Sequence, residues 1–294
     1  MATNMPTAEV EVTTGIVRSL LRSQRPDLAH LEVRVLANGW DNSSFRVGVE
    51  LVARFPRRAI AAGLIENEAR WLPELAPHLT LPVPAPLFLG RPEAGYPWRW
   101  ALAPYISGDA VAGLEDLDLP QAAEDLGQFL RSLHSPAPPD APENPYRGIP
   151  LALRDRATRE RIDQLDPTVD PRSLLGIWDA AMTVPEFDDQ PVWLHGDLHP
   201  NNMLASGGNI TGIVDFGDIT SGDPATDLSV AWMLFPADIH PRFRAAYGEV
   251  EDETWERARG WALSLAVSYL AHSADNPTMG RIGSKTIDRL LPGV

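Results

Sequence analysis

Short runs in which apolar and polar residues alternate fill the first part of the chain, a pattern typical of half-buried β-strands. The alternating apolar positions are Leu31, Val33, Val35, Phe45, Val47, Leu51 and Val52. A polar turn over 38–42 interrupts them, and further short strands are expected at 86–90 and 99–106. Apolar residues at helical spacing predict helices over 7–24 and 59–76. The N-terminal part is therefore expected to be a sheet with one or two helices.

Helical spacing dominates the chain after Gly108. The expected helices cover 119–134, 171–183, 224–235, 238–248, 252–273 and 284–291. A proline-rich connection without a clear period lies at 136–150, and a strand and a hairpin around Ser206–Asn209 are also expected. The pattern predicts an α+β fold with a β-rich N-terminal lobe (1–107) and a mainly helical C-terminal lobe (108–294). A cleft between the lobes is the natural place for a ligand.

Composition and charge exclude several classes of protein. The 294 residues are 44% hydrophobic, as in a globular protein, and carry a net charge of −15. This charge argues against nonspecific binding to nucleic acid or to an anionic membrane, because both need a basic surface. The N-terminus is polar and acidic, unlike a signal peptide, and no apolar run reaches the ~18 residues that span a bilayer. We expect a cytoplasmic monomer or homodimer with no membrane or nucleic-acid partner.

The cysteine and lysine counts exclude further chemistry. Cysteine is absent, which rules out disulfides, a thiolate nucleophile and a zinc–thiolate site. Of the 25 basic residues only Lys285 is a lysine, a bias that GC-rich codons explain most simply. No lysine in the body of the chain is available for a Schiff base, a general base or a phosphate anchor. A side-chain cation that anchors a phosphate must therefore be arginine.

Two polar motifs lie in an otherwise apolar part of the C-terminal lobe. The first is His195–Asn202 (HGDLHPNN) and the second is Asp215–Asp218 (DFGD), and an apolar strand-like run precedes each of them. Phosphoryl transfer needs a carboxylate that orients the acceptor hydroxyl and hard oxygen ligands that hold Mg²⁺ against the phosphates. Asp197 suits the first task, and Asn202 and Asp215 suit the second.

The pair H-G-D-x-x-x-x-N and V-D-F-G-D resembles the aminoglycoside phosphotransferase and choline kinase superfamily, the antibiotic-kinase relatives of protein kinases. Three further segments resemble the same family: N-G-W-D-N-S-S-F-R-V, E-N-E-A-R-W-L-P-E-L and G-D-P-A-T-D-L. The similarity covers roughly residues 30–290 and is greatest to the macrolide-kinase side of the family. It implies a protein-kinase-like bilobal fold with a nucleotide cleft between the lobes.

The resemblance implies a role for each matching residue. Asp197 would be the catalytic base, and Asn202 and Asp215 would be Mg²⁺ ligands. The turn that covers the nucleotide phosphates would contain Gly39, Asn42, Ser43 and Ser44. The adenine hinge would include Pro104, whose nitrogen cannot donate, and Ile106, whose N–H can.

Arg54 stands where the family has its phosphate-anchoring lysine, so the chain departs from the pattern there. Arginine keeps the charge and can bind phosphate through two N–H groups, although its planar group is larger. A solvated charge at a strand edge is the simpler alternative. The partner carboxylate would be Glu68, with Glu66 as the alternative.

Other polar residues near the motifs are expected to support the loop. His195 is expected to hold the catalytic loop by hydrogen bonds, and His199 approaches substrate or lies at the surface. Asp227 either caps its helix or, by resemblance, ties back to the backbone of the catalytic loop. Asp218 is either a second metal ligand or a residue that supports the turn.

The sequence as a whole predicts an ATP- or GTP-dependent O-phosphotransferase that acts with Mg²⁺ on a hydroxyl of a small molecule, such as an antibiotic. The acceptor stays open between three classes. An aminoglycoside would use the acidic run at 249–256, a macrolide would use an apolar wall, and a small metabolite needs neither. The residues of that wall would come from Trp178, Met182, Trp232, Met233, Trp255 and Trp261, although helical spacing also suits core positions. A nucleotide-binding pseudokinase or regulatory module and a metal-dependent phosphohydrolase are the alternatives.

Overall fold

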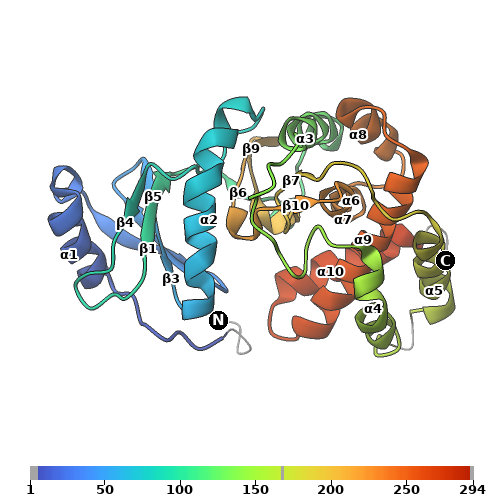
Figure 1. Cartoon of the computed structure of the whole chain (residues 1–294), viewed down its shortest axis with the longest axis horizontal. Coiled ribbons are helices and arrows are strands. Elements are labelled where there is room, and N and C mark those ends of the chain that lie inside the picture. Colours follow the sequence, from blue (N-terminus) through green and yellow to red (C-terminus); the bar gives the residue numbers. More distant parts are fainter. Residues whose placement is uncertain (1–5, 167–168, 292–294) are drawn as a thin grey trace.

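The structure is a computed structural model that describes residues 6–166 and 169–291. Residues 1–5 and 292–294, the outer ends of the two expected lobes, lie outside the described residues, as do 167–168. A β-sheet with two flanking helices forms the N-terminal part, and a mainly helical body forms the rest (Figure 1). The predicted α+β, protein-kinase-like architecture is confirmed. Among the described residues, no helix is long and apolar enough to cross a membrane.

The N-terminal sheet has five antiparallel strands in the order β1-β2-β3-β5-β4. The strands are β1 (Val33–Asn38), β2 (Asn42–Val47), β3 (Leu51–Pro56), β4 (Phe88–Gly90) and β5 (Trp100–Pro104). Helix α1 (Thr14–Gln24) lies on the outer side of the sheet, and α2 (Ala59–Leu75) lies on the side toward the helical part (Figure 1). The predicted meander and its turn are therefore present.

An aromatic cluster holds this sheet together. The rings of Phe55 and Trp100 are stacked 5.2 Å apart, and Phe45 and Tyr96 meet Phe55 edge-on. Such pairs contribute roughly 0.5–1.5 kcal/mol beyond their area burial. Helix α1 covers one side of this cluster with its buried apolar face. The helix starts at Thr14, because the Thr13 side chain accepts from the N–H of Ile16, so the prediction of a start at residue 7 is wrong.

The helical part is organised around α9 (Asp252–His272), most of whose residues between Thr254 and Val267 are buried. The other helices are α3 (Leu119–Leu133), α4 (Asp155–Ile162), α5 (Pro171–Thr183), α6 (Ala225–Leu228), α7 (Val230–Leu234), α8 (His240–Tyr247) and α10 (Pro277–Leu290). Two small sheets lie next to them. In the first sheet, β10 (Thr220–Gly222) pairs with β7 (Val192–Leu194). In the second, β8 (Met203–Ser206) lies between β6 (Asp109–Ala110) and β9 (Asn209–Ile213).

Several predictions for this part need correction. The predicted helix over 224–235 is two short helices, α6 and α7, and α10 begins seven residues earlier than predicted, at Pro277, where Asn276 caps it. Helix α4 was not predicted, because it is mostly charged and buries only Thr158 and Ile162. A helix with so narrow an apolar stripe leaves little periodic signal in its sequence.

The proline-rich connection over 136–150 packs against β10 and the residues just before it. The hydroxyl of Thr220 donates to the carbonyl of Pro142 at 2.7 Å. Gly148 and Gly222 pack backbone against backbone, and a Cβ on Gly222 would lie 2.1 Å from the carbonyl oxygen of Gly148. Both glycines also have positive φ, 67° and 158°. These contacts hold the connection against β10, and they therefore fix the positions of its side chains.

Candidate functional site

The first motif, His195–Asn202, forms a loop after the buried strand β7, and we call it the HGD loop. Asp227 of α6 holds the start of this loop by hydrogen bonds. The Asp227 carboxylate accepts from the backbone N–H groups of His195 at 2.7 Å and of Gly196 at 3.0 Å. The His195 ring is buried and bonds at both nitrogens. Its Nδ1 accepts from the N–H of Asp197, so its Nε2 donates to the carbonyl of Val214 at 3.0 Å. These bonds join the two sequence motifs into one rigid unit.

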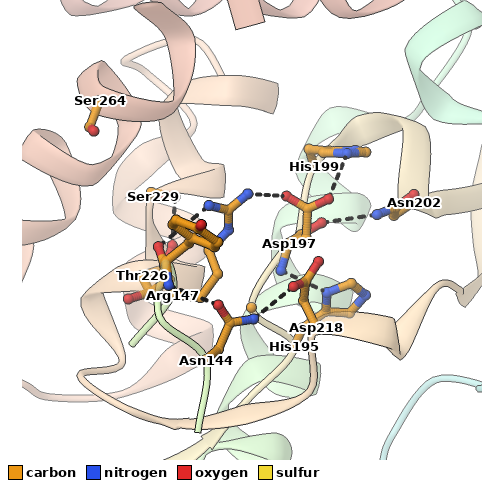
Figure 2. A network of polar contacts seen from close by, with 12 residues as sticks. Asn144, Arg147, His195, Asp197, His199, Asn202, Asp218, Thr226, Ser229 and Ser264 are labelled. Atoms are coloured by element: carbon orange, nitrogen blue, oxygen red, sulfur yellow. Dashed lines mark hydrogen bonds and ion pairs between the residues drawn. The ribbon is translucent and has the colours of Figure 1, made fainter. Parts of the chain in front are cut away.

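Asp197 projects from this loop between two basic side chains (Figure 2). Its Oδ1 lies 2.9 Å from Nη2 of Arg147, and its Oδ2 lies 3.4 Å from Nε2 of His199. Burial alone would raise the pKa of Asp197, but His199 and Arg147 outweigh it and hold the pKa well below its ordinary value. The carboxylate is therefore ionised at neutral pH and can accept a hydrogen bond from a hydroxyl.

Asn202 and Asp215 present oxygen atoms beside Asp197. The amide nitrogen of Asn202 donates to the carbonyl of Asp197 at 3.0 Å, which leaves the amide oxygen available to a ligand. Asp215 has a side chain that is 57% exposed, and both residues line the same cavity. The φ of Asp215 is 65°, a strained value that costs a non-glycine residue on the order of 1–3 kcal/mol and is often found at functional sites.

The donor set suits Mg²⁺, which takes one or two protein oxygens and completes its shell with water and phosphate oxygens. No group of three or more His, Cys, Asp or Glu side chains that could hold a metal occurs within 6–166 and 169–291. Asn202 and Asp215 therefore form a set of two protein ligands rather than a full coordination shell. Asp218 lies nearby, where its Oδ1 accepts from Asn144 at 2.7 Å. Burial and the charge of Asp197 raise the pKa of Asp218, and they outweigh the opposing effect of Arg147.

Arg54 is buried and lies between two carboxylates. Its Nη1 donates to both oxygens of Glu68, at 2.5 and 2.6 Å, and its Nη2 donates to Oδ1 of Asp215 at 2.9 Å. Arg54 comes from β3, Glu68 from α2 and Asp215 from the second motif, so the pairing joins the sheet to the catalytic unit. The alternative partner Glu66 is instead exposed and lies 3.7 Å from Arg99.

The turn between β1 and β2 arches over the cavity. Gly39, Asn42 and Ser44 line the cavity together with Asp41. The N–H of Gly39 donates to the carbonyl of Asn42, and Asp41 pairs with Arg58 at 2.7 Å. Ser43 is buried and is absent from the cavity wall, because neighbouring residues of a strand point to opposite faces. Of the four residues expected to cover the phosphates, Ser43 is therefore the one that does not line the cavity.

Pro104 and Ile106, the residues expected at the hinge, also line the cavity. The backbone N–H of Ile106 donates to no backbone acceptor in the part of the chain that the structure describes. Apolar side chains of Val52, Leu204 and Val214 form walls near this hinge. A flat base between these walls can therefore accept from the Ile106 N–H.

Arg54, Asp197, Asn202, Asp215 and Asp218 line one cavity of about 1220 Å³ together with the β1–β2 turn and the expected hinge. Its far end is formed by side chains that the sequence did not single out, among them Arg147, Arg154 and Arg161. Arg147 belongs to the connection over 136–150. The proline-rich composition of this segment indicates a linker, so the sequence gives no sign that Arg147 contacts Asp197. Arg161 belongs to α4 and Arg154 directly precedes it, and the apolar period does not reveal this segment. Only their even spacing, seven residues apart, could have drawn attention to them.

The acceptor sites expected from the sequence lie elsewhere. No residue of the acidic run 249–256 lines this cavity. The same holds for the six Trp and Met residues that were considered for an apolar wall, of which five are buried in the core and Met182 packs against it. The interpretation of these residues as core positions is confirmed.

Comparison with known proteins agrees with this geometry. The family model described as "Phosphotransferase enzyme family" matches residues 32–261. An aminoglycoside 3'-phosphotransferase from Escherichia coli is 24% identical over 211 residues, which cover 68% of this chain and 74% of the relative. The uncharacterized protein YcbJ from Bacillus subtilis (strain 168) is 25% identical over 251 residues, 76% of this chain and 75% of the relative.

Solved structures share the fold. The GDP complex of wild-type aminoglycoside 2'-phosphotransferase-IIIa superposes with a TM-score of 0.71 at 23% identity and covers 95% of this chain and 98% of its own. The macrolide 2'-phosphotransferase MphH from Brachybacterium faecium superposes with a TM-score of 0.60 at 21% identity, over 96% and 99% of the two chains. With a family match over most of its length, the chain belongs to the phosphotransferase enzyme family.

Proposed function

We propose that this protein transfers the γ-phosphoryl group of ATP or GTP to a hydroxyl group of a small molecule, with Asp197 as the catalytic base. The observation that carries the proposal is the environment of Asp197. It is an ionised carboxylate on a rigid loop, and it faces a large cavity beside the oxygen donors Asn202 and Asp215. Structural relatives are described as complexes with GDP, ATP or ADP, which supports a nucleotide donor.

The nucleotide would bind under the β1–β2 turn with its base at the hinge. The N–H of Ile106 would donate to the base, and the apolar walls would exclude water. Arg54, fixed by Glu68, presents its second N–H edge on the cavity side, where it meets Asp215 and where phosphates would lie. Glu68 thereby orients the guanidinium, as the family's lysine is oriented by its glutamate, and this proposal lets arginine replace lysine.

Asn202 and Asp215 would hold Mg²⁺, which would neutralise charge on the phosphates. Asp218 adds a further carboxylate at the same edge of the cavity and would support the metal or its water ligands. His195 bonds to the backbone of Asp197 and Val214, and Asp227 accepts from two backbone N–H groups of the loop, so we assign them a supporting role.

Asp197 would act on the acceptor. Its ionised oxygen accepts a hydrogen bond from the acceptor hydroxyl and directs the hydroxyl oxygen at the γ-phosphorus. The new bond joins that oxygen to phosphorus, the bond from phosphorus to the β–γ bridging oxygen breaks, and the hydroxyl proton passes to Asp197. Arg147 and His199 keep the carboxylate ionised and hold its orientation before the acceptor arrives.

The substitution Asp197→Asn tests the proposal. Because the amide cannot take the proton, turnover should fall by about 10²–10⁴-fold, the usual contribution of a positioned base. Binding of Mg–nucleotide, measured by calorimetry, should stay within about threefold, since Asp197 is not assigned to the nucleotide. The exposed Asp188→Asn is the matched control and should leave both quantities unchanged.

Two outcomes would contradict the proposal. If Asp197→Asn lost nucleotide binding and turnover together, Asp197 would have a structural role. If the wild-type protein bound Mg–nucleotide but transferred phosphate to no acceptor, and Asp197→Asn changed nothing, a nucleotide-binding pseudokinase would be the better description.

A further inference from the structure

The end of the cavity beyond Asp197, which we call the acceptor half, is lined by the connection over 136–150 and by residues of α4 and α9. Its basic side chains are Arg147, Arg154 and Arg161, and His272 lies beside them. Arg147 is committed to Asp197. The other two arginines are not required by the chemistry proposed above, and they define the charge of this half.

Among the described residues, Arg154 and Arg161 have polar neighbours but no carboxylate partner. Nε of Arg154 lies 3.4 Å from the hydroxyl of Ser264, and Nη2 of Arg161 lies 3.3 Å from Nε2 of His272. Within the described ranges neither guanidinium has a carboxylate at ion-pair distance. Their neighbours on the same helix do: Arg156 pairs with Glu160, and Arg159 pairs with two aspartates.

Buried nitrogen atoms in this half also lack acceptors. Nη1 of Arg161 and Nε of Arg147 are inaccessible to solvent and have no hydrogen-bond partner among the described residues. A buried donor without a partner costs on the order of 1–3 kcal/mol, and more when it is charged. The guanidinium groups also repel one another: burial and the charges of Arg147 and Arg161 lower the pKa of Arg154 to about 10. A ligand that carries negative charge would relieve the repulsion between the guanidinium groups.

The same half offers nothing to a polycation. The carboxylates that border it are Asp197, which already has two basic neighbours, and Asp218, which accepts from Asn144. An acceptor with several ammonium groups would meet unpaired arginines instead of free carboxylates. Apolar side chains, those of Ile149, Leu153 and Ala157, lie among the arginines and suit a hydrocarbon portion.

We infer that the acceptor is a hydroxylated acid, a small molecule whose carboxylate or phosphate group binds Arg154 and Arg161 while its hydroxyl meets Asp197. The inference rests on the proposed function for the position of the hydroxyl, and on the two unpaired arginines for the charge. Arginine suits either group, because its parallel N–H donors match the oxygens of both carboxylate and phosphate.

A matched set of probes tests the charge directly. 6-Hydroxyhexanoate, its methyl ester and 6-amino-1-hexanol share a chain and a terminal hydroxyl but carry negative, zero and positive charge. 6-Hydroxyhexyl phosphate distinguishes phosphate from carboxylate, and homologues of four to ten carbons test the reach. Binding is measured by calorimetry on wild-type protein saturated with Mg–ADP, so that the anions cannot occupy the nucleotide site.

For at least one chain length, the hydroxy acid should bind about tenfold or more tightly than the methyl ester and the amino alcohol of the same length. The double substitution Arg154→Gln, Arg161→Gln should abolish this preference and leave the affinity for Mg–ADP within about twofold. Arg156→Gln, on the same helix with a side chain that is 92% exposed, is the matched control and should keep the preference. Circular dichroism of each variant shows whether it is folded.

Equal affinity for the three charges, tighter binding of the amino alcohol, or no binding of any acid would overturn the inference. These results are independent of turnover. A protein that binds the acids but never consumes nucleotide supports the anionic site and contradicts the kinase activity. A protein that phosphorylates the amino alcohol and ignores the acids does the reverse.

Discussion

The two halves of the cavity differ in how their arginines are paired. The part of the cavity with the β1–β2 turn, the expected hinge and Arg54 is called the nucleotide half here. There Arg54 lies between Glu68 and Asp215, and Asp41 pairs with Arg58, so both arginines have carboxylate partners. In the acceptor half, Arg154 and Arg161 face the cavity without a carboxylate among the described residues. We therefore assign the nucleotide half to a phosphate donor that binds with a metal ion. We assign the acceptor half to a negatively charged ligand.

The largest effect should come from the nucleotide half. Arg54→Ala removes the phosphate contact and leaves Glu68 buried without a partner, which typically costs 3–5 kcal/mol of stability. We expect kcat/KM for the nucleotide to fall by about 10³-fold, in the range seen when one charged donor is lost from such a site. Arg54→Lys should restore most of the stability and activity. Steady-state kinetics and urea unfolding check both, and equal losses in the two variants would contradict a charge-based role.

The next largest effect should come from Asp227, which supports the loop that carries Asp197. Asp227→Asn replaces a buried carboxylate that accepts from two backbone N–H groups of the HGD loop, at 2.7 and 3.0 Å. Hydrogen bonds to a charged group contribute about 1.5–3 kcal/mol, so we expect a loss of about 2 kcal/mol in unfolding free energy. A parallel fall in kcat should follow, because the loop carries Asp197. Full stability in this variant would show that the loop does not depend on Asp227.

Arg147 separates the two halves, and its loss should have a smaller effect. Arg147→Gln removes one of the two basic neighbours of Asp197, and we expect kcat to fall by about tenfold. The pKa of Asp197 should rise, because a cation that lowers it is gone. The acid limb of the pH–kcat profile should therefore move to higher pH, while KM for the nucleotide stays unchanged. An unshifted acid limb would show that Arg147 does not act through Asp197.

The smallest effect should come from the acidic run that the sequence offered as a site for ammonium groups. Glu251→Gln with Glu253→Gln changes charges that do not line the cavity. Surface changes of this kind usually stay within ±0.5 kcal/mol in stability, and turnover should stay within about twofold. A large loss of acceptor affinity in this double variant would place the acceptor outside the cavity described above.

Sequence reasoning succeeded where local chemistry and periodicity agreed. The meander of β1 to β3 follows from alternating residues around a polar turn, and the residues that meet at Asp197 share two short motifs. The contact of Arg147 with Asp197 could not be found this way, because it depends on backbone packing between Gly148 and Gly222. Arg154 and Arg161 were missed because a charged helix with two buried positions has almost no apolar period.

The same limit applies to the acceptor. An acidic run such as 249–256 is visible in a sequence, and it suggested a cationic substrate. Whether a charge is paired depends on three-dimensional neighbours. Only the structure shows that Arg154 and Arg161 line the cavity and have no carboxylate partner in the described part of the chain.

A crossed titration tests the contrast between the halves most directly. Fluorescent Mg–mant-ADP and 6-hydroxyhexanoate, or the chain length that binds best, are each titrated into Arg54→Gln and into Arg154→Gln, Arg161→Gln, with the acid measured at saturating Mg–ADP. The account predicts that each variant weakens one ligand by about tenfold or more and the other by less than about twofold. It would be contradicted if the α4 variant lost the nucleotide, or if Arg54→Gln lost the acid to the same extent.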